Sequence, residues 1–188
     1  MRRITLDIET TGGGPIVDPA TMELTLVGIH DSETDTYSSY IQEELPQLWP
    51  ILEQADLIIG YNSDHFDIPI LNRYYAGDLT KIKSLDLLVE IRNVLGRRLK
   101  LDSIAKATLG KGKSGSGLDA VKWWQQGKID KIRKYCLDDV RITKEIYEYA
   151  KANGKLKYSD FGTTREIPIE ATNWESAKGN SITHTLPF

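Results

Sequence analysis

The sequence of 188 residues contains a single cysteine, Cys136. One thiol cannot form an internal disulfide, and it cannot supply the several cysteine ligands of a structural zinc site. A disulfide-stapled secreted domain and a cysteine-based zinc domain are therefore excluded. We expect Cys136 to be a small residue of the core, in a protein of a reducing compartment.

Long hydrophobic runs are also absent from the sequence. No stretch approaches the roughly 20 consecutive apolar residues that a transmembrane helix needs. The opening Met1-Arg2-Arg3 resembles the basic start of a signal peptide, but Thr5, Asp7 and Glu9 follow at once and interrupt any apolar segment. We therefore expect no membrane partner and a cytoplasmic location.

The chain has no excess of positive charge. Its 24 lysine and arginine residues are outnumbered by 27 aspartates and glutamates, which gives a formal net charge of −3. Binding of nucleic acid would therefore depend on a local basic patch and on bound metal. The most basic region spans residues 97–113, and its cations are Arg97, Arg98, Lys100, Lys106, Lys111 and Lys113. This region either guides the phosphates of a strand or is a solvated charged loop.

The length of the chain fits one domain with an extension, because single domains commonly contain about 100–200 residues. Hydrophobic residues make up 40% and charged residues 27%, as in ordinary soluble globular proteins. We place a globular domain at residues 1–154, a β-hairpin extension at 155–170 and a mobile tail at 171–188.

Strand periodicity dominates the first third of the chain. Ile4, Leu6 and Ile8 alternate with polar residues, so Asp7 and Glu9 share the other face of the predicted strand. Further strands are expected at 24–30, 36–41 and 57–60, the first two separated by a turn-like Asp31-Ser32-Glu33. The chain therefore opens with an antiparallel meander.

Helical periodicity dominates the second half. A stripe of apolar and small residues predicts a long helix over 128–152, ended by Gly154. The other predicted helices lie at 45–52, 68–76, 86–95 and 102–109. Beyond the long helix, the runs 155–158 and 165–169 predict a hairpin joined by a polar turn that contains Gly162. Together these elements predict an α/β fold with a mixed sheet flanked by helices.

Three separate segments offer carboxylates for phosphodiester hydrolysis, which needs a placed water molecule and neutralisation of the phosphate charge. The first is Leu6-Asp7-Ile8-Glu9-Thr10, where an Asp-x-Glu pair at a strand end could equally be solvated. The second ends at Asp67, near a helix N-terminus, where the alternative is a capping aspartate. Asp64 competes with Asp67 for the same role.

The third segment lies inside the long predicted helix. Tyr135 and Asp139 are four residues apart and therefore share one face, whereas Asp138 points elsewhere. Taken alone, this pair is more typical of a core-edge tyrosine beside a surface carboxylate. Joint occurrence of the three segments is far more specific than any one of them.

In order and spacing, the three segments resemble the motifs of the ribonuclease H-like exonucleases with the Asp-Glu-Asp-Asp signature, in the tyrosine-containing branch. The resemblance spans about residues 4–150 and is closest to the proofreading domain of family B DNA polymerases and to stand-alone or helicase-associated relatives. It includes the pattern Asn62-x-x-x-Phe66-Asp67 and the segments Ser84 to Leu88 and Leu99 to Ala105. The histidine branch has its base where this chain has Lys134, which favours the tyrosine branch.

The resemblance implies a two-metal site for Mg²⁺ or Mn²⁺. In it, Asp7, Glu9 and Asp139 bind the metal that activates water, Asp7 bridges to a second metal, and Asp67 completes the second site. Tyr135 would orient the attacking water. The candidate substrate-binding residues are Thr10, Asn62 and Phe66, although Phe66 is more typical of a core residue than of a stacking platform.

The function that the resemblance implies is a 3′→5′ exonuclease, which shortens single-stranded DNA or RNA from a free 3′ end and releases nucleoside 5′-monophosphates. DNA is the favoured substrate, and a polymerase or helicase acting in trans is a possible partner. Two alternatives are an RNA-processing nuclease of the same fold and an inactive nucleic-acid-binding domain. A decayed site would ordinarily lack a ligand, but all four carboxylates and Tyr135 are present.

Overall fold

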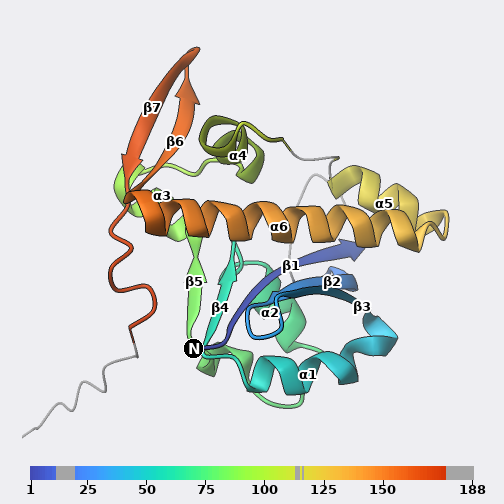
Figure 1. Cartoon of the computed structure of the whole chain (residues 1–188). Helices are drawn as coiled ribbons and strands as arrows, with labels where there is room; N and C mark the ends of the chain where they lie inside the picture. Colours follow the sequence, from blue (N-terminus) through green and yellow to red (C-terminus); the bar gives the residue numbers. More distant parts are fainter. Residues whose placement is uncertain (12–19, 113–114, 116, 177–188) are drawn as a thin grey trace, which may run out of the picture.

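Helices surround a five-stranded sheet in the part of the chain that the computed structural model describes, residues 1–11, 20–112, 115 and 117–176 (Figure 1). The strands are β1 (Arg3–Thr11), β2 (Glu23–Asp31), β3 (Thr36–Ile41), β4 (Leu57–Gly60), β5 (Ser84–Asp86), β6 (Lys155–Asp160) and β7 (Thr163–Pro168). The α-helices are α1 (Leu45–Glu53), α2 (Asp67–Asn72), α3 (Leu87–Leu95), α4 (Leu101–Leu109), α5 (Gly117–Gln125) and α6 (Ile129–Asn153), and short 3₁₀ helices lie at Gln42–Glu44 and Leu79–Lys81.

The large sheet is mixed, as predicted. Its strand order is β3-β2-β1-β4-β5, in which β1, β2 and β3 form an antiparallel meander. Strands β4 and β5 run parallel to β1 and to each other. Strand β5 was not predicted, because its three residues are too few to show a period.

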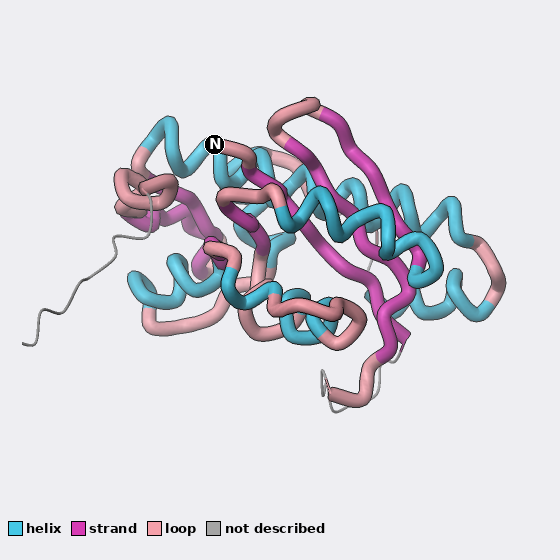
Figure 2. Tube along the Cα trace, turned by 90° about the horizontal axis from the view of Figure 1, so that it is seen from below, coloured by secondary structure: helices cyan, strands magenta, loops and turns pink. Residues whose placement is uncertain are grey.

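Alternation along β1 separates the two faces of the sheet. Ile4, Leu6 and Ile8 are buried in a core that also contains residues of α1 and α2. Helix α6 covers the opposite face, where it packs against β1 and β2 (Figure 1). Seen from below, helices lie across the strands of the sheet (Figure 2). The side chains at positions 7 and 9 therefore face α6.

Helix α6 is the longest element and confirms the predicted stripe. The residues of that stripe are all buried, namely Ile132, Cys136, Val140, Thr143, Tyr147 and Ala150. The helix ends at Gly154, whose φ of 64° is the left-handed conformation that glycine adopts without strain. Among the described residues, none of the helices combines the length and the hydrophobicity that a bilayer-spanning segment needs.

Helix α2 is shorter than predicted and ends at Asn72 instead of residue 76. The Asn72 side chain accepts a hydrogen bond from the Leu79 backbone N–H at 2.7 Å, and the Tyr74 hydroxyl accepts one from the Leu24 N–H at 3.0 Å. These contacts satisfy backbone donors outside the helix and hold the chain after Asn72 in a turn.

The predicted hairpin is present, but its turn differs from the prediction. Strands β6 and β7 pair from Lys155↔Pro168 to Asp160↔Thr163, so the turn consists of Phe161 and Gly162 alone. The turn contains Gly162, as predicted, but it is shorter than expected, and Phe161 makes it less polar. Leu156 and Tyr158 of β6 are buried in the core that α3, α4 and α6 share, which ties the base of the hairpin to the main domain.

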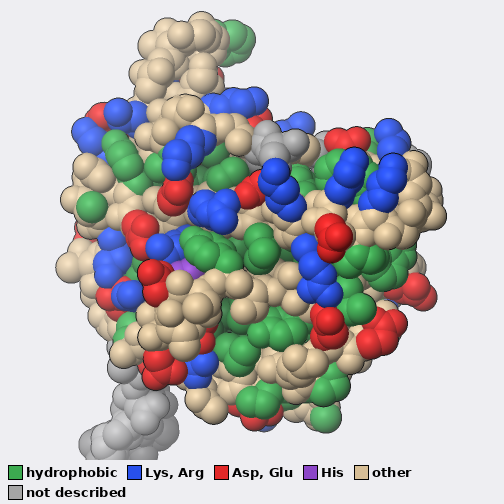
Figure 3. Space-filling model, turned by 45° about the vertical axis from the view of Figure 1, so that its right-hand side comes forward, with side chains coloured by type: hydrophobic (Ala, Val, Ile, Leu, Met, Phe, Trp, Pro, Cys, Tyr) green, Lys and Arg blue, Asp and Glu red, His purple; other side chains and the backbone are tan. Residues whose placement is uncertain are grey.

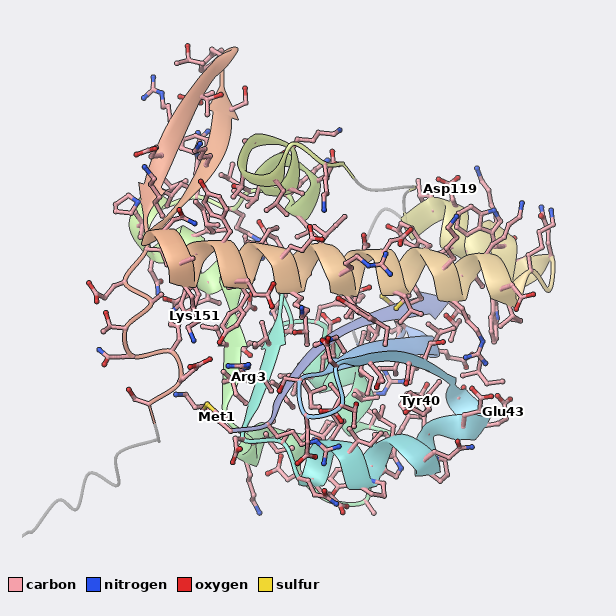
Figure 4. The ribbon with its side chains drawn as sticks, viewed as in Figure 1. Met1, Arg3, Tyr40, Glu43, Asp119 and Lys151 are labelled. Atoms are coloured by element: carbon pink, nitrogen blue, oxygen red, sulfur yellow. The ribbon has the colours of Figure 1, made fainter. Side chains whose placement is uncertain are left out.

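The segment 171–176 also differs from the prediction of a mobile tail. Trp174 is buried and stacks on Tyr147 with ring centroids 5.7 Å apart. Glu175 forms ion pairs with Arg3 at 2.6 Å and with Lys151 at 2.7 Å, two residues that lie near each other at the start of β1 and the end of α6 (Figure 4). These contacts hold the segment on the domain. The rest of the predicted tail, 177–188, lies outside the described residues.

Candidate active site

Strand β1 carries the first two carboxylates of the site on its α6-facing side. Its parallel pairing with β4 ends at Thr5↔Ile59, and the antiparallel register with β2 shifts between Glu9 and Thr10. Such bulges redirect side chains and are common beside functional sites. Glu9 is buried and Asp7 is partly buried, so these carboxylates lie at the boundary between the core and the solvent.

Asp67 joins this strand from α2, where it is the first helical residue. Its Oδ1 accepts a hydrogen bond from the Ile8 N–H at 3.1 Å. Because β4 no longer pairs with β1 at this position, the carboxylate satisfies a donor that the sheet leaves open. Asp67 is thereby held beside the backbone that separates Asp7 from Glu9. The competing candidate, Asp64, is exposed.

The loop before Asp67 is organised by Asp86, for which the sequence analysis assigned no role. The buried Asp86 carboxylate accepts hydrogen bonds from the N–H groups of Asn62 at 2.7 Å, Asp64 at 3.2 Å and Leu88 at 2.9 Å. The same carboxylate therefore caps α3 and also fixes the loop before Asp67. An aspartate directly before a helical Leu-Leu run is an N-cap signal, but the bonds to the loop involve another part of the chain.

Two further features shape this loop. Asn62 has a φ of 68°, a left-handed conformation that asparagine tolerates better than most residues. Its Oδ1 accepts a hydrogen bond from Arg98 Nη2 at 2.5 Å. A Cβ at Gly60 would lie 2.3 Å from Ser63, so this position requires glycine. The hydrogen bond from Arg98 directs the side chain of Asn62 toward the basic region.

A close approach of α6 to the sheet completes the site. Gly28 pairs with Asp7 across the β1–β2 ladder, and a Cβ there would lie 2.8 Å from Cys136 Sγ and 3.2 Å from Val140. The absence of a side chain at Gly28 lets Cys136 reach β1, where its thiol donates to the Asp7 backbone oxygen at 3.3 Å. This approach brings Asp139, on the same helix, to the carboxylates of β1.

The pKa of Tyr135 shows that its hydroxyl lies close to Asp7, Glu9 and Asp139. Burial is the largest cause that raises the pKa of its hydroxyl, and the charges of Asp139, Glu9 and Asp7 raise it further. The hydroxyl also donates a hydrogen bond to Asp139. Tyr135 is therefore protonated at neutral pH and lies among the three carboxylates. The edge of the Trp123 ring packs against it, with ring centroids 6.1 Å apart.

The donor set fits a hard divalent cation. Ligand atoms of Asp7, Glu9 and Cys136 all lie within 4.8 Å of one another. Burial, followed by the charges of Asp7, Glu9 and Asp139, raises the pKa of the Cys136 thiol well above its ordinary value. A protonated thiol is a poor ligand, so the oxygens of the carboxylates are the groups that suit Mg²⁺ or Mn²⁺. The carboxylates of Asp7 and Glu9 could therefore hold such an ion.

A cavity of about 820 Å³ opens next to Tyr135. Its lining includes Asn62, the segment 98–102 and Lys106 of α4. The basic region of the sequence therefore lines the same cavity as Tyr135. Its lining combines the cations Arg98, Lys100 and Lys106 with the apolar side chains of Leu88, Leu99 and Leu101. Lys113 lies outside the described residues.

The remaining candidates have mixed positions. The Thr10 hydroxyl contacts Met22 Sδ at 3.7 Å and is nearly buried. Phe66 is partly buried against the core of α1 and α2, which favours the packing interpretation. Asp138, which was predicted to point away from the face of Tyr135 and Asp139, pairs with Arg141 at 2.7 Å. The structure therefore brings together Asp7, Glu9, Asp67, Tyr135 and Asp139, with Asn62 at the cavity wall.

The sequence matches the model of the RNase H superfamily over residues 4–151. No curated protein matches it significantly. Among solved structures, the family B DNA polymerase from the hyperthermophilic archaeon Pyrobaculum calidifontis is similar, with a TM-score of 0.64 and 18% sequence identity. The similarity covers 80% of this chain and 24% of the polymerase chain, so this chain spans about a quarter of that protein's length. At this identity, the likeness establishes a shared fold.

Proposed function

The chain belongs to the RNase H superfamily, and from this membership we propose that it is a metal-dependent 3′→5′ exonuclease of single-stranded nucleic acid. Superfamily membership supports a nuclease activity. The observation that carries the finer proposal is the convergence of Asp7, Glu9 and Asp139 on Tyr135, whose pKa all three raise. The helix-borne tyrosine distinguishes this arrangement from an endonuclease of the same fold.

Four carboxylates would hold the metal. Asp7, Glu9 and Asp139 would bind one Mg²⁺ or Mn²⁺ ion, and Asp7 and Asp67 would bind a second. When bound, the two ions would neutralise the charge of the scissile phosphate and promote ionisation of the attacking water. The hydrogen bond from the Ile8 N–H already orients the Asp67 side chain. Little further side-chain entropy would therefore be lost when a metal ion binds.

Tyr135 would position the water for attack on phosphorus. Its raised pKa keeps the hydroxyl protonated, so the residue acts through hydrogen bonding rather than as a base. Attack forms a new bond between the water oxygen and phosphorus and breaks the bond from phosphorus to the 3′ oxygen of the preceding nucleotide. The products are a nucleoside 5′-monophosphate and a strand with a new 3′-hydroxyl.

The cavity beside Tyr135 would hold the end of the strand. Asn62 belongs to the loop before Asp67 and lines the cavity. It would contact the sugar or phosphate of the terminal nucleotide. Arg98, Lys100 and Lys106 would neutralise phosphates on the incoming side. Similarity to a family B DNA polymerase favours DNA over RNA and makes a polymerase a reasonable partner in trans.

A comparison of linear and circular substrates tests the proposal. Purified protein is incubated with 5′-labelled linear single strands and with a closed circular strand, in Mg²⁺, Mn²⁺ or EDTA. We expect stepwise loss of mononucleotides from the linear strand, no cleavage of the circle and no reaction in EDTA. Equal cleavage of both substrates would refute the exonuclease activity. Asp139→Asn should abolish hydrolysis, whereas the neighbouring Asp138→Asn, which loses its ion pair with Arg141, should not.

A further inference from the structure

Phe161 at the tip of the β6–β7 hairpin is fully exposed to solvent. Four large hydrophobic side chains are exposed among the residues that the structure describes, and Phe161 is the only aromatic one; the others are Met1, Val94 and Leu118. The hairpin projects from the body of the molecule (Figure 1). Nothing within the described domain covers the ring.

The backbone at this tip is unfavourable for phenylalanine. Phe161 and Gly162 form a two-residue turn with φ of 47° and 81°, the pattern of a type I′ hairpin turn. Asparagine or glycine is preferred at the first of these positions, because bulky residues are strained at positive φ. The chain therefore places a large apolar ring in water and in a strained conformation, with no intramolecular contact in return.

Positively charged side chains lie close to the hairpin tip. Arg97 and Arg165 both contact Asp160, the residue before Phe161, at 3.0 Å and 3.3 Å. One carboxylate thus faces two guanidinium groups, and both arginines are more than half exposed. Lysine and arginine side chains also gather on the upper part of the face below the projecting hairpin in Figure 3. An exposed ring, with two arginines at the residue that precedes it, matches the chemistry that stacks bases and neutralises phosphates.

The tip is connected to the proposed active site through two consecutive arginines. Arg97 bonds Asp160 at the hairpin, and Arg98 bonds Asn62 and lines the cavity beside Tyr135. The guanidinium group of Arg97 also lies over the Tyr158 ring, 5.3 Å from its centroid. A strand that leaves the cavity past Arg98 therefore meets Arg97 and then the hairpin tip.

We propose that the tip formed by Phe161, Arg97 and Arg165 is a second contact surface for single-stranded nucleic acid, on which Phe161 stacks a base upstream of the terminal nucleotide. This inference deepens the proposed function and rests on it. The anchored base of the hairpin makes the tip a fixed platform, since Leu156, Tyr158 and Ile167 are buried in the main core. The surface would retain the strand between successive cleavages.

Binding measurements on Phe161 variants test the inference. Anisotropy of labelled 20-nucleotide and dinucleotide strands is measured in Mg²⁺ with the Asp139→Asn background, so that hydrolysis does not interfere. A base stack contributes about 1–3 kcal/mol, so Phe161→Asn should weaken binding of the long strand about tenfold. Dinucleotide binding should not change. Phe161→Trp should bind the long strand as the parent does, whereas Phe161→Leu should resemble Phe161→Asn, because only an aromatic ring stacks.

Stability and activity measurements separate the possible failures. Phe161→Asn creates the preferred Asn-Gly turn and should melt no lower than the parent, so weaker binding would not reflect unfolding. If long strands bind equally to the parent and Phe161→Asn, the inference is wrong even when hydrolysis is observed. If the strands bind through Phe161 but none is hydrolysed, the proposed function fails and the contact surface stands. Loss of self-association in Phe161→Asn, with unchanged strand binding, would assign the ring to a protein contact instead.

Discussion

Gly28 of β2 and Cys136 of α6 are in such close contact that a Cβ at Gly28 would lie 2.8 Å from the cysteine sulfur. Strands and helices normally approach through side chains on both, and here one partner contributes only backbone. Because Asp7 is the ladder partner of Gly28, this contact sets the distance between α6 and the carboxylates of β1.

Gly28→Ala should therefore lower both stability and activity. The new methyl group must displace Cys136 and Val140, and overpacking of this kind costs about 1–3 kcal/mol. The displacement also moves Tyr135 and Asp139, so we expect the turnover rate to fall by more than tenfold at temperatures where the variant remains folded. Urea unfolding and single-turnover rates measure the two effects.

A matched control for the stability measurement is available at Gly117, the first residue of α5, where nothing lies within 4 Å of an added Cβ. Because Gly117 also lines the cavity beside Tyr135, the control applies to unfolding and not to turnover. Gly117→Ala should be neutral or slightly stabilising, since alanine favours helix. If Gly28→Ala behaves in the same way, Gly28 does not set the position of α6.

The sequence predicts the parts of the site that depend on local periodicity. Alternation along β1 places Asp7 and Glu9 on one face, and the four-residue spacing in α6 does the same for Tyr135 and Asp139. The Gly28 contact was not foreseeable in this way, because it joins two elements that are distant in the chain. Resemblance to a family, rather than any single pattern, connected the segments.

Two further features that the sequence did not predict also depend on contacts between residues distant in the chain. The role of Asp86 depends on backbone N–H groups of a loop that precedes it by more than twenty residues. Burial of Trp174 depends on Tyr147 of α6. The sequence predicted only the start of a helix at Asp86 and a mobile tail around Trp174, because tertiary contacts with distant residues do not show in local composition.

Tyr135→Phe should separate the positioning of water from the binding of metal. The variant loses one hydroxyl but no carboxylate, so we expect the turnover rate to fall about 10²-fold or more, with little change in Mn²⁺ affinity. Asp139→Asn should weaken both activity and metal binding. Calorimetric titration with Mn²⁺ and steady-state rates provide the comparison, with Asp138→Asn as the control. Equal loss of Mn²⁺ affinity in the Tyr135 and Asp139 variants would contradict these roles.

Glu175 should make the docking of segment 171–176 sensitive to acid. Burial raises the pKa of this carboxyl, but hydrogen bonds from Lys151, Tyr147 and Arg3 outweigh burial and lower it to about 2. In the unfolded chain the pKa is about 4.3, so the folded state favours the ionised form. The resulting stabilisation is complete above about pH 4.5 and is lost as the pH falls toward 2.

The Glu175→Gln variant tests this window, because glutamine cannot ionise. Urea unfolding of parent and variant, measured from pH 7 to pH 3, gives the difference in their free energies of unfolding. We expect the parent to be the more stable at pH 7 and the difference to shrink steadily below pH 4.5. A difference that stays constant with pH would mean that packing of Trp174, and not the charge of Glu175, holds the segment.

Asp7→Asn should abolish activity without destabilising the metal-free protein. Ligand atoms of Asp7 and Glu9 lie within 4.8 Å of each other, and like charges at such separations disfavour the native state when no metal is bound. Removing the charge of Asp7 relieves this repulsion, while its backbone oxygen still accepts the bond from Cys136.

Metal that binds only the folded state adds stability, about 2.7 kcal/mol at a hundredfold excess over its dissociation constant. We therefore expect the variant to melt at or above the parent temperature in EDTA and to lose most of the upward shift that Mn²⁺ produces in the parent. Asp138→Asn should retain that shift. A metal-free Asp7→Asn protein that melts well below the parent would show that Asp7 stabilises the fold by packing. It would contradict the idea that the charge of Asp7 destabilises the metal-free protein.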